Sequence, residues 1–245
     1  GNIDQSIKWN PAYQEKTVQI YRTLTLKSQP FAPDLVVWPE TAVPLFFQDG
    51  EPLSRSVLHT AREAGAHVIF GSPAYRRESR SVSFFNRAYL ASPNAEIIGS
   101  YDKVHLVPFG EYVPMKRFLP FVQRLVVGAG DFLPGDKAAP LKFPKAAAGV
   151  LICFESIFPE LGRAMTENGA TLLVNLTNDA WYGMSSAPYQ HFSMAVFRAV
   201  ENRRPVVRAA NTGISAFILP NGKIVAQSGL FTEALLTKEV ALPSS

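Results

Sequence analysis

The sequence predicts an α/β fold in which two mixed sheets pack together and helices cover the outside. Short, continuous runs of apolar, β-forming residues recur along the chain and are too short to be helices. Amphipathic stretches with helical spacing separate these runs. Turn signals between paired runs indicate hairpins, which a purely parallel sheet would not contain. We expect residues 1–245 to form a single domain, because no linker, internal repeat or change of composition divides them.

The first part of the chain alternates helices with strands and then forms a hairpin. Pro11 favours the start of a helix, since proline is preferred in the first helical turn, and Gly65 is expected to end a second helix that starts near Leu53. Pro93-Asn94 marks the hairpin turn. The expected elements are helices over 11–28 and 53–64, buried strands over 35–38 and 67–71, and paired strands over 84–90 and 95–100.

A long segment, 104–139, interrupts this alternation. It is rich in proline, glycine and large apolar residues and lacks a sustained periodicity, which is typical of functional lids and binding loops. We expect its apolar side chains either to face lipid or to fold back onto the core. Its large apolar side chains include Val107, Phe109, Tyr112, Val113, Met115, Phe118, Leu119, Phe121, Leu125 and Val126.

Alternation resumes after this segment. Gly169 is expected to end a helix, and Asn221-Gly222 is a strong signal for a hairpin turn. The expected elements are strands over 149–152, 171–174 and 205–210, helices over 157–168 and 188–201, and a hairpin of 214–219 with 223–227.

The composition argues against several classes of function. The chain has 24 basic and 20 acidic residues, a formal net charge of +4, and no long basic run of the kind that follows a phosphate backbone, so no nucleic-acid partner is expected. Its single cysteine excludes an intramolecular disulfide. No apolar run reaches the ~18 residues of a membrane helix, so the chain as given is expected to be soluble. Its abrupt start at Gly1 indicates a fragment cut from a longer protein.

Three residues have the type and the position to carry chemistry. Cys153 lies between an apolar strand and a helix, the kind of turn that lifts a nucleophile above a sheet. Glu40 ends another strand and would act as a general base, and Lys103 would stabilise an oxyanion. Each residue also has an ordinary alternative, because free cysteines usually pack in cores and most glutamates and lysines are solvated at the surface.

Three segments, in order, resemble the signature motifs of the nitrilase, or carbon–nitrogen hydrolase, superfamily. They are Trp38-Pro39-Glu40, the segment from Lys103 to Glu111, and Ile152-Cys153-Phe154-Glu155. That superfamily uses a Glu-Lys-Cys triad in an α-β-β-α sandwich. The resemblance therefore implies this fold, with Glu40, Lys103 and Cys153 as the catalytic residues.

A closer resemblance, over essentially the whole chain, is to the apolipoprotein N-acyltransferase branch of that superfamily, in its periplasmic catalytic domain. There are two departures: Phe154 stands where this branch often has tyrosine, and the opening strand is cut short at Gly1. The matching segments are Gly1-Asn2-Ile3, Lys8-Trp9, Val107 to Pro114, Asn178 to Gly183, Gln190-His191-Phe192, Arg198-Ala199, Glu201, Arg203, Pro205 and Asn211 to Ile214.

This resemblance implies a domain that faces the periplasm from the bacterial inner membrane, between membrane-spanning segments that are absent here. It implies that Cys153 takes a fatty acyl chain from a phospholipid as a thioester and passes it to the N-terminal amine of a lipidated apolipoprotein. The implied partners are the phospholipid donor, the lipidated apolipoprotein acceptor and the membrane surface. No cofactor or metal is expected, since the four histidines lack metal-ligand spacing.

Supporting roles follow from the same resemblance. Glu40 would remove the thiol proton while Lys103 and the backbone N–H of Phe154 hold the oxyanion. Glu111 and Glu155 would orient Lys103 or Glu40 through hydrogen bonds. The residues expected to shape the substrate cleft are Trp9, Trp181 and Tyr182.

Three other functions use the same residues differently. A soluble amidase of the nitrilase family would share the triad but release the acyl group to water, and would not bind phospholipid vesicles. A cysteine–histidine dyad of Cys153 with His191 would make Lys103 dispensable. A non-catalytic lipid-binding module is the third alternative, and an intact triad argues against it.

Overall fold

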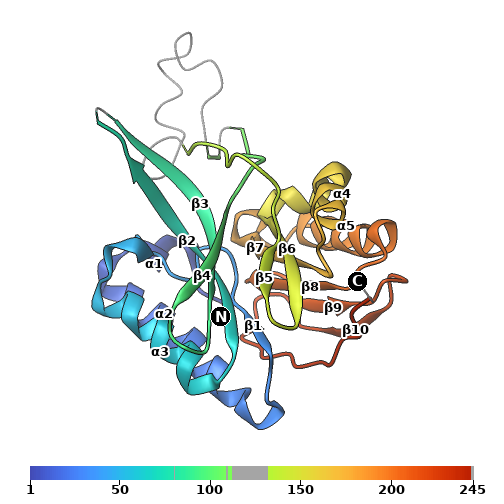
Figure 1. Cartoon of the computed structure of the whole chain (residues 1–245), viewed down its shortest axis with the longest axis horizontal. Coiled ribbons are helices and arrows are strands. Elements are labelled where there is room, and N and C mark those ends of the chain that lie inside the picture. Colours follow the sequence, from blue (N-terminus) through green and yellow to red (C-terminus); the bar gives the residue numbers. More distant parts are fainter. Residues whose placement is uncertain (80, 109, 112–131, 244–245) are drawn as a thin grey trace.

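The computed structural model describes residues 1–79, 81–108, 110–111 and 132–243. Figure 1 shows two sheets side by side, with one group of helices outside each sheet. This arrangement confirms the α-β-β-α sandwich expected from the sequence. Most of the large apolar side chains of 104–139, from Phe109 to Val126, lie outside the described residues, so the expectation that this segment faces lipid is not tested.

The first sheet has four strands in sequence order. β1 is parallel to β2, and the remaining neighbours are antiparallel. Helices α2 and α3 pack on its outer face, while α1 precedes α2. The bounds are α1 Gln5–Lys8, α2 Pro11–Lys27, β1 Leu35–Val37, α3 Pro52–Ala64, β2 His67–Arg77, β3 Val82–Ala91 and β4 Ile97–Asp102, with short 3-10 helices η1 Gln29–Phe31 and η2 Phe47–Asp49.

The second sheet has six strands in the order β10-β9-β8-β7-β6-β5. Its centre, β6-β7-β8, is parallel, and antiparallel strands flank it on both sides. Helices α4 and α5 cover the outer face. The bounds are β5 Leu141–Phe143, β6 Ala146–Ile152, η4 Cys153–Ile157, α4 Pro159–Glu167, β7 Leu172–Asn178, η5 Asp179–Tyr182, α5 Ala187–Asn202, β8 Val206–Asn211, β9 Ala216–Ile218 and β10 Ile224–Gln227.

Strands of the first sheet are apolar on both faces because both faces are covered. In β2, Val68 and Phe70 pack with the α2–α3 layer, whereas Ile69 between them packs with residues of the second sheet. This is the period-2 alternation of strand side chains. It explains why β2 appears in the sequence as an unbroken apolar run.

Five elements differ from the expectation. β2 and β3 extend beyond the core into a polar hairpin, where Arg76 lies over the Phe85 ring, so the apolar signal stops before the strands do. β7 continues through polar residues to Asn178, all of them buried. The short strand β5 and helix α1 were not expected, because three- and four-residue elements carry too little periodicity.

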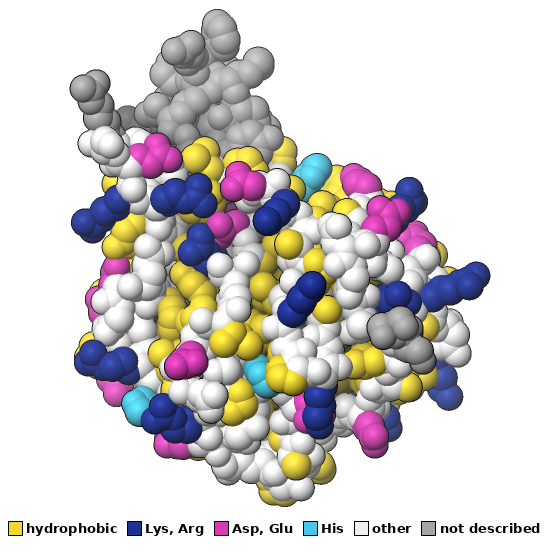
Figure 2. Space-filling model, in the orientation of Figure 1, with side chains coloured by type: hydrophobic (Ala, Val, Ile, Leu, Met, Phe, Trp, Pro, Cys, Tyr) yellow, Lys and Arg dark blue, Asp and Glu magenta, His cyan; other side chains and the backbone are white. Residues whose placement is uncertain are grey.

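The surface shows mixed charge. On the face shown in Figure 2, Lys and Arg side chains are interspersed with Asp and Glu and form no continuous basic patch. Within the described residues, no helix combines the length and the apolarity needed to cross a bilayer.

Candidate active site

Cys153 occupies a sharp turn at the end of β6. Ile152 is the last residue of the strand and η4 begins at Cys153, whose φ of 53° lies in the left-handed region. A non-glycine residue in this region is strained, and such strain is often found at functional sites. Burial raises the pKa of the Cys153 thiol to about 12, with the Glu40 charge adding to the rise and Lys103 opposing it. The thiol therefore keeps its proton at neutral pH and needs a base to become a nucleophile.

A cavity of roughly 640 Å³ opens at Cys153. It brings together eight of the nine residues that the sequence singles out, and it lies between the ends of strands from both sheets. The expected residues in its lining are Glu40, Lys103, Cys153, Glu111, Phe154, Trp9, Trp181 and Tyr182.

One asparagine connects the two carboxylates of this cavity. Asn86, on β3, donates from Nδ2 to Glu40 Oε1 and to Glu111 Oε1, at 2.8 Å in each case. Glu111 Oε2 in turn accepts from Lys103 Nζ at 2.7 Å. A single chain of contacts therefore runs from Glu40 through Asn86 and Glu111 to Lys103.

The ion pair holds Lys103 in its charged form. The lysine is almost completely buried, at 1% exposure, and burial alone would lower its pKa. The charges of Glu111, Cys153 and Glu40 overcome this effect, so the pKa of Lys103 rises above its ordinary value. A fixed ammonium in such a position is suited to stabilise a developing oxyanion.

Gly71 allows Glu40 to approach the first sheet. A side chain at Gly71 would overlap the backbone of Glu40 and Thr41. The Gly71 N–H donates to the carbonyl of Pro39 at 3.3 Å, and its own carbonyl accepts from Val43 at 3.1 Å. The turn that carries Glu40 is therefore fixed by backbone contacts to β2.

Glu155 lies outside the cavity lining and contacts backbone instead of the two expected side chains. Its Oε1 accepts from the N–H groups of Val104 and His105 and from the Tyr101 hydroxyl, and its Oε2 accepts from the Ile152 N–H, at 2.7 to 3.0 Å. It thereby joins the segment just after Lys103 to the strand end just before Cys153. Burial raises the pKa of Glu155, although these hydrogen bonds oppose the rise.

The aromatic residues form the open side of the cavity. Trp9 and Trp181 line the cavity and are nevertheless 47% and 64% exposed. Tyr182 is half-buried, with its ring 6.0 Å from that of His191, and burial raises its pKa to about 12. Phe154 contacts Phe158 edge to face.

Lys8 is a cavity residue that the sequence reasoning did not assign. Its side chain is fully buried, and Nζ donates to the backbone carbonyl of Glu40 at 3.1 Å. Burial lowers the pKa of Lys8 to about 8, against the opposing charges of Glu40 and Cys153. The cavity thus has two lysines and two glutamates, with one cation beside Glu40 and the other beside Glu111.

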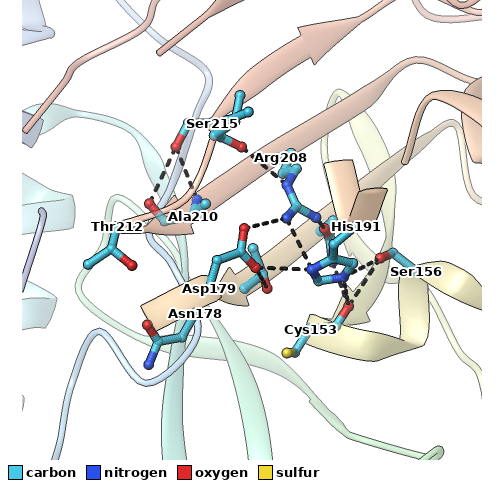
Figure 3. Close-up of polar contacts among 12 residues, drawn as sticks. Cys153, Ser156, Asn178, Asp179, His191, Arg208, Ala210, Thr212 and Ser215 are labelled. Atoms are coloured by element: carbon cyan, nitrogen blue, oxygen red, sulfur yellow. Dashed lines mark hydrogen bonds and ion pairs between the residues drawn. The ribbon is translucent and has the colours of Figure 1, made fainter. Parts of the chain in front are cut away.

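A second polar cluster lies at the carbonyl oxygen of Cys153, and the thiol points away from it (Figure 3). Its centre is Asp179, which pairs with Arg208 at 2.8 Å and with His191 at 3.0 Å. Burial would raise the pKa of Asp179, but His191 and Arg208 lower it below its usual range. The contacts of His191 do not match a catalytic dyad, because Nε2 lies 3.1 Å from the Cys153 carbonyl oxygen and Nδ1 faces Asp179.

A polar residue inside an apolar strand is the sequence signal that could have located these buried polar groups, and it was not used above. Asn86, Asn175 and Arg208 each interrupt an apolar strand and are buried. A buried polar side chain in a strand must find hydrogen-bond partners, so it marks a place where other polar groups gather. Within the described residues no group of three or more His, Cys, Asp or Glu side chains has the arrangement of a metal site.

The chain belongs to the carbon–nitrogen hydrolase family. The sequence model described as carbon-nitrogen hydrolase matches residues 5–245. The protein is therefore an enzyme of the nitrilase superfamily.

Curated relatives of this chain belong to one branch of the family. The chain is 54% identical over 243 residues to an apolipoprotein N-acyltransferase of Geobacter metallireducens, covering 99% of this chain and 47% of the relative. It is 36% identical over 248 residues to an apolipoprotein N-acyltransferase of Pasteurella multocida, covering 98% of this chain and 47% of the relative. The chain thus spans about half the length of the curated relatives it matches.

Solved structures support the fold. An amidase from Nesterenkonia sp. AN1, with an acetamide moiety covalently added at its active-site cysteine, superposes with a TM-score of 0.66 at 20% identity, covering 89% of this chain and 81% of the amidase. A carbon-nitrogen hydrolase from Helicobacter pylori G27 gives a TM-score of 0.66 at 18% identity, covering 88% and 80% of the two chains. At these identities the likeness shows a shared fold only.

Proposed function

We propose that residues 1–245 form the catalytic domain of an apolipoprotein N-acyltransferase, with Glu40, Lys103 and Cys153 as its triad. The observation that carries the proposal is the cavity where a thiol, a carboxylate and an ion-paired ammonium lie together, in a chain 54% identical to a relative of that name. The domain would act at the periplasmic face of a bacterial inner membrane. Its substrates would be a phospholipid and a lipidated apolipoprotein.

The first half-reaction forms a thioester. Glu40 takes the proton from the Cys153 thiol, and Sγ attacks the carbonyl carbon of the phospholipid ester. The oxyanion of the tetrahedral intermediate is held by Lys103 Nζ and by the Phe154 backbone N–H. The C–O bond then breaks, Glu40 returns its proton to the leaving alkoxide, and a lysophospholipid departs while the acyl group stays on sulfur.

The second half-reaction transfers the acyl group to nitrogen. The uncharged amine of the acceptor attacks the thioester carbonyl, and the same donors stabilise the new oxyanion. Glu40 takes a proton from the attacking nitrogen as the C–S bond breaks. The products are an amide and a thiolate, to which Glu40 returns the proton.

Other cavity residues would support these steps. Glu111 keeps Lys103 charged and in place, and Asn86 fixes the positions of the Glu40 and Glu111 carboxylates relative to each other. Glu155 would act through the backbone on both sides of the site. Trp9, Trp181 and Tyr182 would shape the cleft in which the two substrates bind in turn.

Intact-protein mass spectrometry tests the first half-reaction. The full-length protein in detergent is incubated with phosphatidylethanolamine, alongside Cys153→Ala. We expect a fatty-acyl adduct on the wild type alone, and we expect neutral hydroxylamine to remove it, as thioesters are cleaved under these conditions. Addition of a diacylglyceryl-cysteine peptide should discharge the adduct and yield the N-acylated peptide.

Three other results would change the assignment. An adduct that forms but passes only to water would identify a hydrolase of the amidase type. An adduct that forms equally on Cys153→Ala would remove Cys153 from the mechanism. A lack of adduct from phospholipid, together with acylation of Cys153 by a small activated ester, would keep the nucleophile and exclude phospholipid as its donor.

A further inference from the structure

The strained backbone of Cys153 requires something to hold it. With φ at 53°, Cys153 has a left-handed backbone conformation, which is less stable than the right-handed one for a residue with a side chain. Such conformations persist only where the surroundings over-determine them. The contacts that fix this turn therefore also fix the direction in which the thiol points.

Three side-chain donors converge on the carbonyl oxygen of Cys153. Ser156 Oγ donates at 3.1 Å, Asn175 Nδ2 donates at 3.3 Å, and His191 Nε2 lies 3.1 Å away. These residues come from η4, β7 and α5, so three separate elements meet at one atom; Figure 3 shows the contacts that Ser156 and His191 make with it. A carbonyl oxygen only accepts hydrogen bonds, so His191 donates to it in the tautomer that carries the proton on Nε2, which also lies 3.0 Å from Ser156 Oγ.

Two of these donors are held in turn by Arg208. Arg208 Nη1 donates to Asn175 Oδ1, and Nη2 donates to Asp179 Oδ2 at 2.8 Å. Asp179 Oδ1 then faces His191 Nδ1 at 3.0 Å. Asn175 and His191 are thus the ends of two branches that start at one buried guanidinium and close on the Cys153 carbonyl.

The branches are sealed from solvent. The side chain of Arg208 is fully buried and that of Asp179 is 1% exposed, and a side chain on Gly213 would overlap the Asp179 carboxylate. Thr177 Oγ1 donates to Asp179 Oδ1 at 3.1 Å. Buried polar networks with their partners satisfied are rigid, which suits a device that positions another group.

We infer that His191 and Asn175, held by Asp179 and Arg208, are positioning residues that fix the Cys153 nucleophile through its carbonyl oxygen. The inference rests on Cys153 being the nucleophile of the proposed function. His191 acts on the backbone and takes no proton from the thiol. Loss of the Nε2 donor removes one of the contacts that fix the turn, and the thiol then moves out of the position from which it attacks the substrate.

The test measures the rate at which the Cys153 thiol reacts with a small alkylating agent, which does not depend on acyl transfer. The full-length protein, with any cysteine outside this chain replaced, is alkylated with iodoacetamide from pH 7 to 10, as wild type, His191→Leu and His191→Gln. The glutamine Nε2 replaces the imidazole Nε2 donor, whereas leucine removes it. A displacement of about 1 Å at a reacting atom costs up to about 100-fold in rate, so we expect His191→Leu to react at least tenfold more slowly at every pH. His191→Gln should remain within about threefold of wild type.

A destabilised control separates positioning from general loss of structure. Leu172→Ala, in the same core, should lower the melting temperature at least as much as His191→Leu but leave the alkylation rate near wild type. Equal losses in Leu172→Ala and His191→Leu, or a wild-type rate in His191→Leu, would overturn the inference. Failure of phospholipid acylation in all variants, with this alkylation pattern intact, would count against the proposed function alone.

Discussion

Two polar clusters lie on opposite sides of Cys153, and they are built differently. The cavity cluster, Glu40, Asn86, Lys103 and Glu111, borders open space and has exposed tryptophans at its edge. The buried cluster, Asn175, Asp179, His191 and Arg208, lies in the interior, and none of its residues is more than 5% exposed. Both contain an ion pair of nearly equal length, 2.7 Å for Lys103–Glu111 and 2.8 Å for Arg208–Asp179.

From this difference we expect the Lys103–Glu111 pair to serve the reaction and the Arg208–Asp179 pair to serve the structure. A charge beside a cavity interacts with whatever enters it, so Lys103 should affect the reaction rate far more than the stability. A charge with no access to the cavity interacts only with its protein partners, so Arg208 should affect the free energy of unfolding first. The predictions below test this distinction.

Lys103→Met should give the largest effect, on rate. Loss of an oxyanion donor typically costs 100- to 1,000-fold in kcat, and we expect roughly 1,000-fold slower acylation from phospholipid. Stopped-time mass spectrometry of the thioester measures this rate. Lys145→Met, which removes an exposed lysine paired with Asp34, is the matched control and should acylate at the wild-type rate; a loss under tenfold in Lys103→Met would contradict the assigned role.

Arg208→Met should give the largest loss of stability. Removal of one partner from a buried ion pair leaves the other charge uncompensated, which costs about 3–5 kcal/mol. Urea unfolding followed by tryptophan fluorescence measures the change. If Lys103→Met destabilised the protein by as much as Arg208→Met, the proposed contrast between the two clusters would fail.

Lys8→Met should change how the free energy of unfolding depends on pH. The pKa of Lys8 is about 8 in the folded protein against an ordinary value of 10.5, so between these values the unfolded chain binds more protons and the stability of the wild type rises with pH. The difference in unfolding free energy, wild type minus Lys8→Met, should therefore grow by roughly 1–3 kcal/mol from pH 8 to 10. A difference that is flat or falls over this range would show that Lys8 is not held in a depressed-pKa state.

Asn86→Leu should slow the reaction with little loss of stability. It removes the hydrogen bonds to Glu40 and Glu111 and also removes Oδ1, which has no hydrogen-bond partner among the described residues. We expect acylation to fall about tenfold, the equivalent of about 1.4 kcal/mol, with unfolding changed by less than about 1 kcal/mol. A stability loss that accounts for the whole rate loss would assign Asn86 to folding alone.

Glu63→Ala should have the smallest effect and sets the baseline. Glu63 pairs with Arg22 at 2.6 Å, but both side chains are well exposed, and exposed pairs contribute at most about 1 kcal/mol. We expect no change in acylation and a change in unfolding free energy within about 1 kcal/mol, reduced further at high salt. A larger change would place this pair outside the usual range for surface pairs.

The sequence predicted the sandwich and eight residues of the cavity lining, but not Lys8, Asn86 or the buried cluster. Cys153, Glu40 and Lys103 each follow a strand, and strand ends are visible in an apolar pattern. Arg208 and Asn175 lie within strands, where their polarity appears only as an interruption of that pattern. Their partners, Asp179 and His191, come from other elements, so the network exists only after the second sheet and α5 have packed.

The position of β5 and the length of β2 were missed for a related reason. A three-residue strand such as Leu141–Phe143 carries no measurable period, and the outer end of β2 pairs through its backbone while its side chains are arginines. Backbone pairing is independent of side-chain polarity. Hydrophobic patterns therefore locate the part of a strand that lies in the core and underestimate the rest.

The two sheets supply different members of the proposed triad. Glu40 and Lys103 follow strands of the first sheet, whereas Cys153 follows a strand of the second. Glu40 and Lys103 precede Cys153 in the chain and are therefore synthesised first, but they lie beside its thiol only after the two sheets have packed together. A half-folded chain therefore carries Cys153 without Glu40 and Lys103 beside it, and the proposed acylation requires both sheets to be packed together.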